Sequence, residues 1–287
     1  MKKKSRNRFY SLWSGAIILA LVLVVFSLIF ASATGGGGKD DDSVSNSPAT
    51  DVPASGAPAS DFPNPQDTPQ PDAPAASDEP AGDAPTILAE TEDMGQEYID
   101  KMIFLGDSTT HGLAAYNVVD PNHVWTPASG TLTLDHWSYT AIVYPDTGEE
   151  ILIPAAVELK KPEYMVITLG INGVSFMDED YFIETYTALV KAIQAASPDT
   201  KIILNSIYPI AASYANQGSI NNQKIDTANT WVLRVAEDTG VRYLNSCVVL
   251  KGEDGFMPES YQNGDGLHPT GEAYGYVIYY IRTHGYK

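Results

Sequence analysis

The stretch Phe104-Leu105-Gly106-Asp107-Ser108-Thr109-Thr110 joins an apolar run to a polar one. Four apolar residues, Met102 to Leu105, stop at Gly106, and polar residues follow where a buried strand would end and a helix begin. Ligands of open α/β sheets bind at the carboxyl ends of strands. Ser108 is therefore a candidate nucleophile, and the plainer alternative is that it only caps the helix.

Short apolar runs alternate with helical patterns through residues 87–287, a length that suits a single core. The runs are rich in Ile, Val and Leu and are bounded by polar residues, Gly or Pro, as in strands buried on both faces. We expect strands at Met102–Leu105, Tyr164–Leu169, Lys201–Ile207 and Val241–Leu244, and helices at Tyr181–Ala196, Ile225–Asp238 and Thr270–His284. The alternation predicts an α/β fold with helices around a mainly parallel sheet.

One insertion, between Gly112 and Pro154, departs from this alternation. It contains a predicted β-hairpin, Ala141–Tyr144 and Glu149–Ile153, around Pro145-Asp146-Thr147-Gly148. Long insertions near the carboxyl ends of strands commonly shape binding sites. We expect this one to form the wall or lid of a pocket.

Residues 1–34 have the pattern of an N-terminal membrane anchor or signal segment. Five basic residues precede an apolar run, Leu12 to Ala33, that is long enough to span a hydrocarbon core of about 30 Å. Ala31-Ser32-Ala33 resembles a signal-peptidase site. We expect a single-pass protein of the cell membrane with an extracellular catalytic domain; the alternative is secretion after cleavage near Ala33.

Residues 35–86 are rich in Pro, Ala, Asp and Ser and contain almost no aliphatic or aromatic side chains. Such a segment buries too little apolar surface to offset its chain entropy. We therefore predict a disordered linker between the membrane segment and a folded domain at 87–287.

The chain is strongly acidic, with a formal net charge of −19 at pH 7, and the folded part carries most of this charge. A domain of this charge repels nucleic acid and anionic surfaces, which excludes nucleic acid as a partner. The single cysteine, Cys247, excludes an intramolecular disulfide and a Cys-based zinc cluster, and its apolar neighbours predict a buried small side chain. No pattern indicates an oligomeric state.

A carboxylate and an imidazole stand three residues apart in Asp265-Gly266-Leu267-His268-Pro269. Serine is a weak nucleophile unless a base takes its proton and a carboxylate orients that base. In a loop, Asp265 can reach Nδ1 of His268 and leave Nε2 free for Ser108. The backbone N–H of Ser108, a glycine N–H and the side chain of Asn172 can donate to the developing oxyanion.

Three ordered motifs, Gly106-Asp107-Ser108, Gly170-Ile171-Asn172 and Asp265-Gly266-Leu267-His268, resemble the first, third and fifth sequence blocks of the SGNH/GDSL hydrolase superfamily. The resemblance spans residues 100–285. It implies a flavodoxin-like α/β/α three-layer sandwich and ester hydrolysis by a Ser-His-Asp triad.

Carried onto this chain, the family's roles fall on five residues. Ser108 would be the nucleophile, His268 the general base and then acid, and Asp265 the orienting carboxylate. Ser108, Gly130 and Asn172 would form the oxyanion hole, with Gly130 of Ala128-Ser129-Gly130 taken as the second block.

Two positions depart from the family pattern. Thr109 replaces the usual leucine, and Gly173 replaces the aspartate that usually follows the asparagine of the third block, which bears on the support of the Asn172 loop. The other common serine-hydrolase scaffold requires Gly-x-Ser-x-Gly, and Thr110 stands at its second glycine position.

We expect no cofactor and no metal. A metal site built from Asp107, His111, Asp135 and His136 is the less favoured interpretation of those residues, because they offer no third fixed ligand.

The expected function is an extracytoplasmic serine esterase that removes small O-acyl groups, such as acetyl, from a cell-wall or surface glycan. Five aromatic residues either stack on sugar rings or belong to the core: Trp125, Trp137, Tyr139, Tyr208 and Tyr214. The alternatives are a lipase-like or thioesterase-like hydrolase of longer acyl chains, and a non-catalytic surface binding module, which Gly173 and the aromatic-rich insertion favour.

Overall fold

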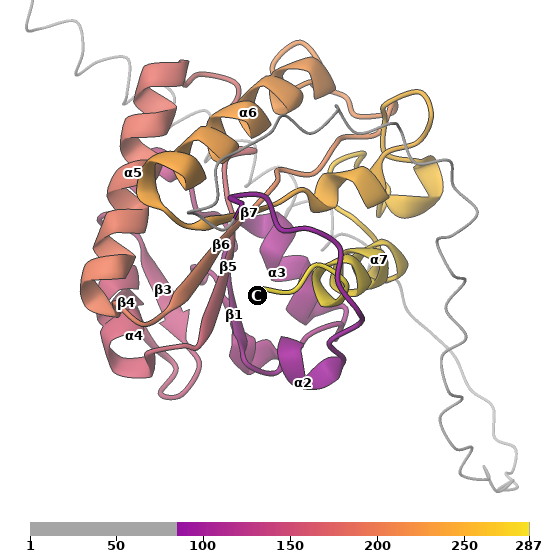
Figure 1. Ribbon diagram of the computed structural model, residues 1–287. Coiled ribbons are helices and arrows are strands. Elements are labelled where there is room, and N and C mark those ends of the chain that lie inside the picture. The colour runs from indigo at the N-terminus through magenta and orange to yellow at the C-terminus, as the bar shows by residue number, and fades with distance from the viewer. Residues whose placement is uncertain (1–84, 287) are drawn as a thin grey trace, which may run out of the picture. The chain divides into compact units, whose positions relative to one another are not determined.

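The computed structural model describes residues 85–286, and a five-stranded parallel sheet runs through them (Figure 1). The strand order is β2-β1-β5-β6-β7. The bounds are β1 Met102–Gly106, β2 Val124–Trp125, β5 Tyr164–Thr168, β6 Lys201–Asn205 and β7 Arg242–Leu244. Gly106 at the end of β1 pairs with Thr168 at the end of β5, so the segments after these two strands emerge side by side.

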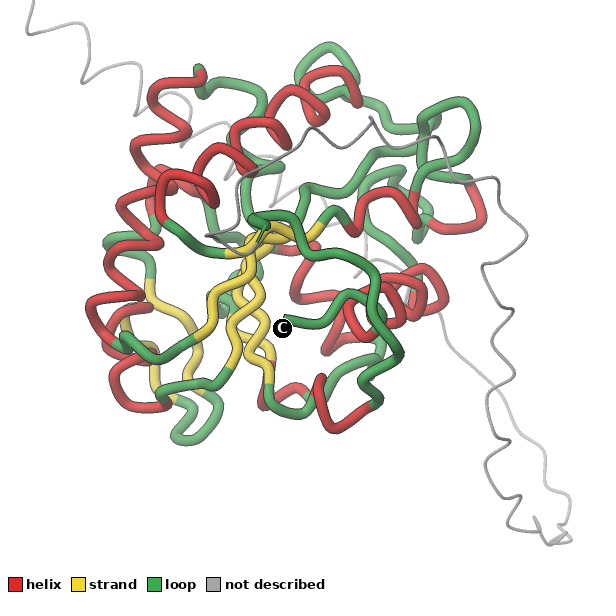
Figure 2. The backbone as a smooth tube through the Cα atoms, viewed as in Figure 1, coloured by secondary structure: helices red, strands yellow, loops and turns green. Residues whose placement is uncertain are grey.

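Helices cover both faces of this sheet, which confirms the α/β three-layer fold; Figure 2 shows the strands in yellow between the red helices. The helices are α2 Gln96–Ile99, α3 Ser108–Ala115, α4 Ile153–Lys160, α5 Glu179–Ala196, α6 Asn222–Thr239 and α7 Gly271–Arg282. Within residues 85–286, the 3₁₀ turns are η2 Pro121–His123, η3 Leu134–His136, η4 Ser246–Leu250 and η5 Glu259–Tyr261.

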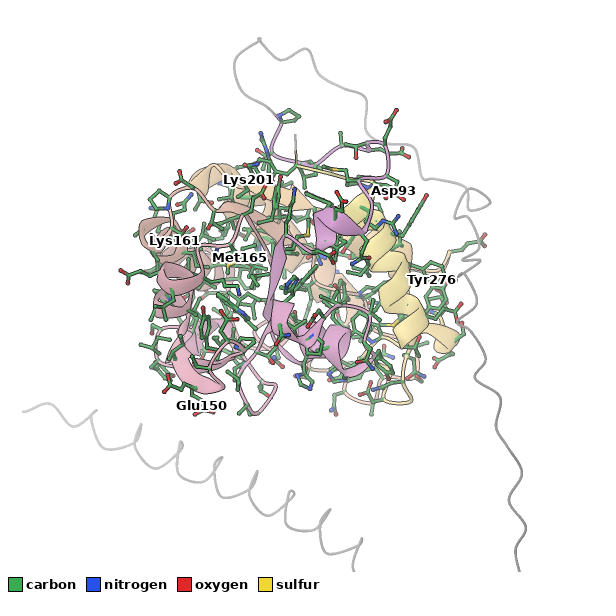
Figure 3. The ribbon with its side chains drawn as sticks, turned by 90° about the horizontal axis from the view of Figure 1, so that it is seen from below. Asp93, Glu150, Lys161, Met165, Lys201 and Tyr276 are labelled. Atoms are coloured by element: carbon green, nitrogen blue, oxygen red, sulfur yellow. The ribbon has the colours of Figure 1, made fainter. Side chains whose placement is uncertain are left out.

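Side chains of β1 alternate between the two layers of the core. Leu105 packs in the cluster that contains α4, α5 and α6, whereas Phe104 packs in the cluster that contains α2, α3 and α7. This follows from the period of two along a strand, because both faces are covered and both sets of side chains must be apolar. In Figure 3, Met165 of β5 lies in the interior, with Lys161 and Tyr276 on opposite sides of it.

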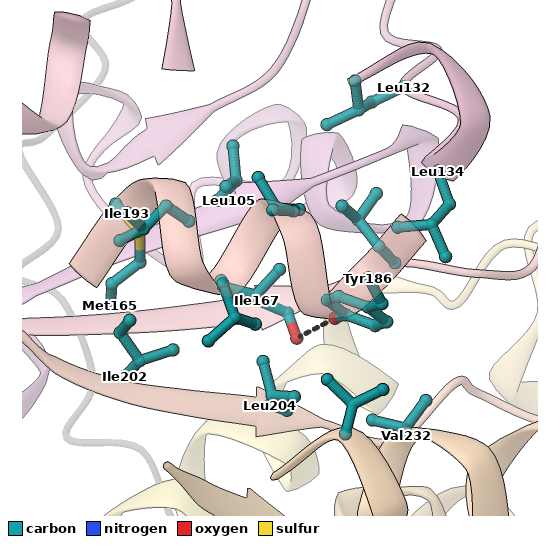
Figure 4. Packing of buried hydrophobic residues seen from close by; sticks show 14 of the residues in the cluster. Leu105, Leu132, Leu134, Met165, Ile167, Tyr186, Ile193, Ile202, Leu204 and Val232 are labelled. Atoms are coloured by element: carbon teal, nitrogen blue, oxygen red, sulfur yellow. Dashed lines mark hydrogen bonds between the residues drawn. The ribbon is translucent and has the colours of Figure 1, made fainter. Parts of the chain in front are cut away.

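The larger cluster fixes the sheet against α5 and α6 (Figure 4). Leu105, Ile167 and Leu204 come from three adjacent strands and are all fully buried. Each such side chain contributes about 1.5–3 kcal/mol by leaving water. Tyr186 of α5 lies among them, and its hydroxyl donates to the Ile167 carbonyl at 3.4 Å, so its polar atom is not left unpaired.

The predicted strands and helices are confirmed, with shifts of a few residues at their ends. Two helices start earlier than their apolar patterns because of polar caps: Asp178 accepts from the Tyr181 N–H before α5, and Asn221 accepts from the Lys224 N–H before α6, each at 3.0 Å. Gly240 ends α6 in the left-handed conformation, with φ 70°. Thr270 caps α7 as predicted.

The predicted hairpin forms as β3 Ala141–Tyr144 and β4 Glu149–Leu152. Its Ile142 and Tyr144 are buried in the larger core cluster. Ile153, predicted as its last strand residue, instead begins α4, and Pro154 occupies the first turn, where its missing N–H costs nothing. Two elements were not expected: β2, inside the predicted insertion, and α4, which begins at the end of the insertion.

The predictions for the membrane segment at 1–34 and for nearly all of the linker at 35–86 fall outside the described residues. Thr86 and Leu88 form backbone hydrogen bonds with Tyr243 of β7. Between residues 85 and 286, no helix has the length and apolar character needed to cross a membrane.

Candidate active site

Ser108 stands on the sharp turn from β1 into α3. A Cβ on Gly106 would come within 2.4 Å of the Thr168 carbonyl oxygen, so the close approach of β1 and β5 requires glycine. Asp107 then caps α3, because its Oδ1 accepts from the Thr109 N–H at 3.0 Å and from the Thr109 hydroxyl at 2.8 Å. The alternative that Ser108 only caps the helix is therefore wrong, because Asp107 occupies the cap position.

The structure brings Ser108, His268 and Asp265 together. Ser108 Oγ lies 2.8 Å from His268 Nε2, although the two residues are 160 positions apart. His268 Nδ1 lies 2.6 Å from Asp265 Oδ2. The other Asp265 oxygen, Oδ1, accepts from the N–H groups of Leu267 and His268 at 2.7 and 2.9 Å. The hydrogen-bonded order is serine hydroxyl, imidazole, carboxylate.

The charge of Asp265 favours one tautomer of His268. Partial burial raises the pKa of the Asp265 carboxyl, but the His268 N–H, the imidazole and the Leu267 N–H together lower it below its ordinary value. An ionised carboxylate at 2.6 Å accepts a proton held on Nδ1. Nε2 is then an acceptor for the Ser108 hydroxyl, as general base catalysis requires.

Gln262 binds the loop that carries Asp265 and His268 at two points. Gln262 Oε1 accepts from the N–H groups of Gly264 and Gly266, at 2.5 and 2.9 Å, on both sides of Asp265. Gln262 Nε2 donates to Glu259 Oε2 at 2.9 Å. The carboxylate of Glu259 in turn accepts from the Ser213 N–H and hydroxyl.

Sequence reasoning missed Gln262. An amide that binds backbone N–H groups in a loop leaves no periodic pattern. The sequence offers one hint of an unusual loop, the glycines on either side of Asp265. Both have positive φ in the structure. Gly266 also approaches the backbone of Tyr214 so closely that a Cβ would lie 2.7 Å from it.

Two predicted oxyanion donors emerge from neighbouring strands. The Ser108 N–H, at the first position of α3, makes no hydrogen bond within residues 85–286, and the helix N-terminus adds partial positive charge. Asn172 follows β5, the neighbour of β1, and its Nδ2 donates to the Leu132 carbonyl at 3.4 Å.

Gly130, the third predicted donor, lies beside α3, where a Cβ would be 3.9 Å from His111. Its backbone has φ 69°, which suits glycine. Its N–H donates to the Pro127 carbonyl at 2.8 Å. In this arrangement that amide is engaged in a turn, and the role of Gly130 as an oxyanion donor stays a prediction.

Local packing leaves little room for a side chain at Gly173. A Cβ there would lie 2.7 Å from Met177 Sδ, so the aspartate typical of the family would displace Met177, which is buried in the core. The turn that carries Asn172 is closed instead by backbone bonds from the Gly173 and Val174 N–H groups to the Gly170 carbonyl, at 2.8 and 3.1 Å. Backbone hydrogen bonds thus supply the support that the missing carboxylate would give.

The residues of the less favoured metal interpretation have other partners. Asp107 binds Thr109, His111 Nδ1 lies 3.3 Å from Thr126 Oγ1, and Asp135 pairs with His136 at 3.1 Å. Among residues 85–286, no group of three or more His, Cys, Asp or Glu side chains is arranged to hold a metal ion.

Of the aromatic residues singled out in the sequence, Trp125 and Tyr208 are buried. Trp137 and Tyr214 are partly buried and pack against the larger core cluster. Tyr139 is 65% exposed. The predicted burial of Cys247 is confirmed, and burial raises the pKa of its thiol.

The model of the GDSL-like lipase/acylhydrolase family matches residues 104–276, more than half of the chain. The chain belongs to this family, which confirms the resemblance to the SGNH/GDSL superfamily, and it is a carboxylic ester hydrolase. A search of curated proteins found no match.

Several solved structures are similar to this chain. A GDSL-like lipase from Bacteroides thetaiotaomicron has 20% identity and a TM-score of 0.45, over 65% of this chain and 87% of its own. A carbohydrate esterase family 3 protein from Talaromyces cellulolyticus has 19% identity and a TM-score of 0.42, over 63% and 93%. The acetylxylan esterase Axe2 from Geobacillus stearothermophilus has 18% identity and a TM-score of 0.40, over 65% and 94%.

Proposed function

We propose that this ester hydrolase acts outside the cytoplasm and removes small O-acyl groups from a cell-wall or surface glycan, with Ser108, His268 and Asp265 as its catalytic triad. The observation that carries the proposal is the unbroken hydrogen-bonded chain from Ser108 Oγ to His268 Nε2 and from His268 Nδ1 to Asp265 Oδ2. This is the arrangement that activates serine in acyl transfer.

In the proposed mechanism, His268 Nε2 takes the Ser108 proton while Oγ attacks the ester carbonyl carbon. The Ser108 N–H and the Asn172 amide donate to the resulting oxyanion. His268 then gives the proton to the departing sugar hydroxyl, which leaves an acyl group on Ser108. A water molecule, deprotonated by His268, releases this acyl group as a carboxylic acid, and Asp265 remains ionised throughout.

The proposed location and substrate rest on the sequence. A basic and then apolar segment at 1–34 directs the chain to a membrane, and a Pro-rich linker at 35–86 would let the hydrolase domain reach a surface polymer. The strong negative charge of the folded part disfavours anionic lipid as a substrate.

Labelling with a fluorophosphonate probe tests the nucleophile. We expect the full-length chain to be labelled and Ser108→Ala to lose both labelling and at least about 10⁴-fold of its aryl acetate hydrolysis. Ser138→Ala, which removes an exposed serine outside the proposed triad, is the matched control and should behave like the wild type. Equal labelling of Ser108→Ala would overturn the assignment.

The same preparation tests the substrate class. We expect release of acetate from an O-acetylated surface polysaccharide and faster hydrolysis of aryl acetate than of aryl palmitate. A preference for palmitate would favour the lipase-like alternative.

A further inference from the structure

Three exposed aromatic side chains occur in segments near Asn172. Tyr139, Phe176 and Tyr181 are 65%, 58% and 45% exposed, and the first two are the most exposed aromatic side chains among residues 85–286. An exposed ring forgoes the stabilisation that burial would give it. Clustered exposure of this kind commonly marks a ligand-binding surface.

The three rings belong to two segments that pack on each other. Phe176 lies four residues after Asn172, in the same turn region, and Tyr181 is in the first turn of α5. Tyr139 follows η3, which contacts α5. The Asn172 side chain bonds to the Leu132 carbonyl, just before η3, and thereby ties the two segments together.

The electrostatic surroundings of the Tyr139 phenol include groups of both segments. The pKa of the Tyr139 phenol is raised, first by partial desolvation and then by the nearby Asp135 carboxylate and Tyr181 hydroxyl. Tyr139 also packs on one side against the His136 ring, with the centroids 5.0 Å apart. We call Tyr139, Phe176 and Tyr181 the aromatic ledge.

Other side chains of the same two segments are buried normally. Leu134, Val174 and Met177 all lie in the larger core cluster. The two segments therefore have access to the core and use it for their aliphatic residues. Trp137 and Phe182, aromatic residues of the same segments, also pack on or in this cluster. The three rings of the aromatic ledge are instead left facing outward, where a ligand that favours aromatic rings can bind.

We propose that the aromatic ledge binds sugar rings of a neutral glycan chain while an O-acyl group of that chain is presented to Ser108. This inference rests on the proposed function and names the part of the site that recognises the polymer. The C–H groups on the face of a pyranose carry partial positive charge and pack on the electron-rich face of an aromatic ring.

The charges around the ledge favour this occupant over the other candidates. Asp135, Glu179 and Asp180 stand in the same two segments and can accept hydrogen bonds from sugar hydroxyls. The same carboxylates repel anionic polymers and anionic lipid surfaces. A long acyl chain needs continuous apolar contact, which rings interspersed with carboxylates do not provide.

The test compares esters of different chain length on the full-length protein. The probes are O-acetylated monosaccharides and tetrasaccharides of three neutral types, based on xylose, glucose and N-acetylglucosamine. For at least one type we expect the tetrasaccharide to have a lower KM than the monosaccharide. Tyr139→Ala and Phe176→Ala should each raise the KM for that tetrasaccharide about three- to tenfold, the usual effect of losing one ring contact.

Matched variants separate ring stacking from disturbance of the fold. Tyr139→Phe should still have a lower KM for the tetrasaccharide than for the monosaccharide, because the aromatic ring remains. Tyr279→Ala removes an exposed tyrosine from α7 and should not change the KM. Aryl acetate turnover, measured in parallel, reports the catalytic step independently of the glycan.

Results of two kinds, one in the wild type and one in a double variant, would overturn the proposed role of the aromatic ledge. One is the absence of any chain-length gain in all three series. The other is a gain that survives the double variant Tyr139→Ala/Phe176→Ala, or a loss in that variant that falls on aryl palmitate instead of the tetrasaccharide. The failure of the proposed function would look different, because the wild-type protein would then release no acetate from any of the acetylated saccharides, whatever their length.

Discussion

The proposed nucleophile, Ser108, and its proposed base, His268, are positioned in opposite ways. Asp107, Thr109 and Thr110, the neighbours of Ser108, are buried, and the turn continues a strand paired inside the sheet. Asp265 and His268, in contrast, lie in a partly exposed loop without regular secondary structure. Side-chain bonds to backbone N–H groups hold that loop.

The hydrophobic core therefore sets the position of Ser108, whereas a small polar network sets the position of His268. Changes beside the nucleophile should therefore act mainly on folding stability. Changes in the polar network should act mainly on turnover. The following three substitutions test this separation.

Asp265→Asn should have the largest effect. An asparagine can keep its Oδ1 bonds to the Leu267 and His268 N–H groups, but its NH₂ would face His268 Nδ1 as a donor. Nδ1 would then lose its proton, and Nε2 would carry it and no longer accept from Ser108. We expect kcat to fall about 10³–10⁴-fold with aryl acetate, with little change in the urea midpoint of unfolding. A fall of less than tenfold would remove Asp265 from the triad.

Gln262→Ala should have an intermediate effect, because Gln262 acts through the loop and not on the substrate. The N–H groups of Gly264 and Gly266 lose their acceptor, so His268 is held less well against Ser108. We expect kcat for aryl acetate to fall about tenfold or more with KM nearly constant. A merely structural role would lower the unfolding midpoint and leave kcat per folded molecule unchanged.

Two further variants control this experiment. Gln262→Glu restores the acceptor oxygen but brings a second carboxylate against Glu259. It should recover part of the lost kcat, and the recovery should increase at high ionic strength, which screens this repulsion. Gln217→Ala removes an exposed glutamine bonded to the Ala212 carbonyl and should leave kcat unchanged.

Asp107→Asn should act on stability, with its sign set by pH. Burial, partly offset by the bonds from Thr109, raises the pKa of the Asp107 carboxyl from 3.8 to about 6. Between these values the unfolded chain loses its proton first, so this group lowers the stability of the folded state as the pH rises. Asparagine keeps the capping oxygen without the charge.

The urea-derived free energy of unfolding of Asp107→Asn, minus that of the wild type, should therefore increase by about 1–3 kcal/mol from pH 4 to pH 7. Thr109→Ser, which keeps the hydroxyl that binds the same carboxylate, is the control and should show no comparable trend. A difference that stays constant with pH would mean that Asp107 is not held in a desolvated environment.

Most of the fold follows from patterns that the sequence displays openly. Buried parallel strands such as Tyr164–Thr168 are continuous apolar runs, and an amphipathic helix such as α5 repeats its apolar residues at helical spacing. The three groups of the candidate triad stand within two residues of a glycine, in short motifs that lie beside predicted strands or helices. Ser108, Asp265 and His268 were therefore all predicted from the sequence.

The missed features have no such pattern. The two residues of β2 are too few to show a period, and they are strand only because they pair with the edge of β1. Gln262 acts through two backbone N–H groups that any sequence would supply. The hydrogen bond from the Gly130 N–H to the Pro127 carbonyl arises from a local turn. A glycine at position 130 does not by itself predict that turn.

The link between α7 and α3 has a consequence for the time at which activity arises during synthesis. The Tyr274 hydroxyl donates to the Thr109 carbonyl at 2.6 Å, and a Cβ on Gly112 would clash with the Tyr274 ring. His268 and α7 thus dock onto a helix made about 160 residues earlier. Contacts of such long sequence separation form late, so we expect Ser108 to lack its proposed base in a growing chain until α7 has emerged and docked.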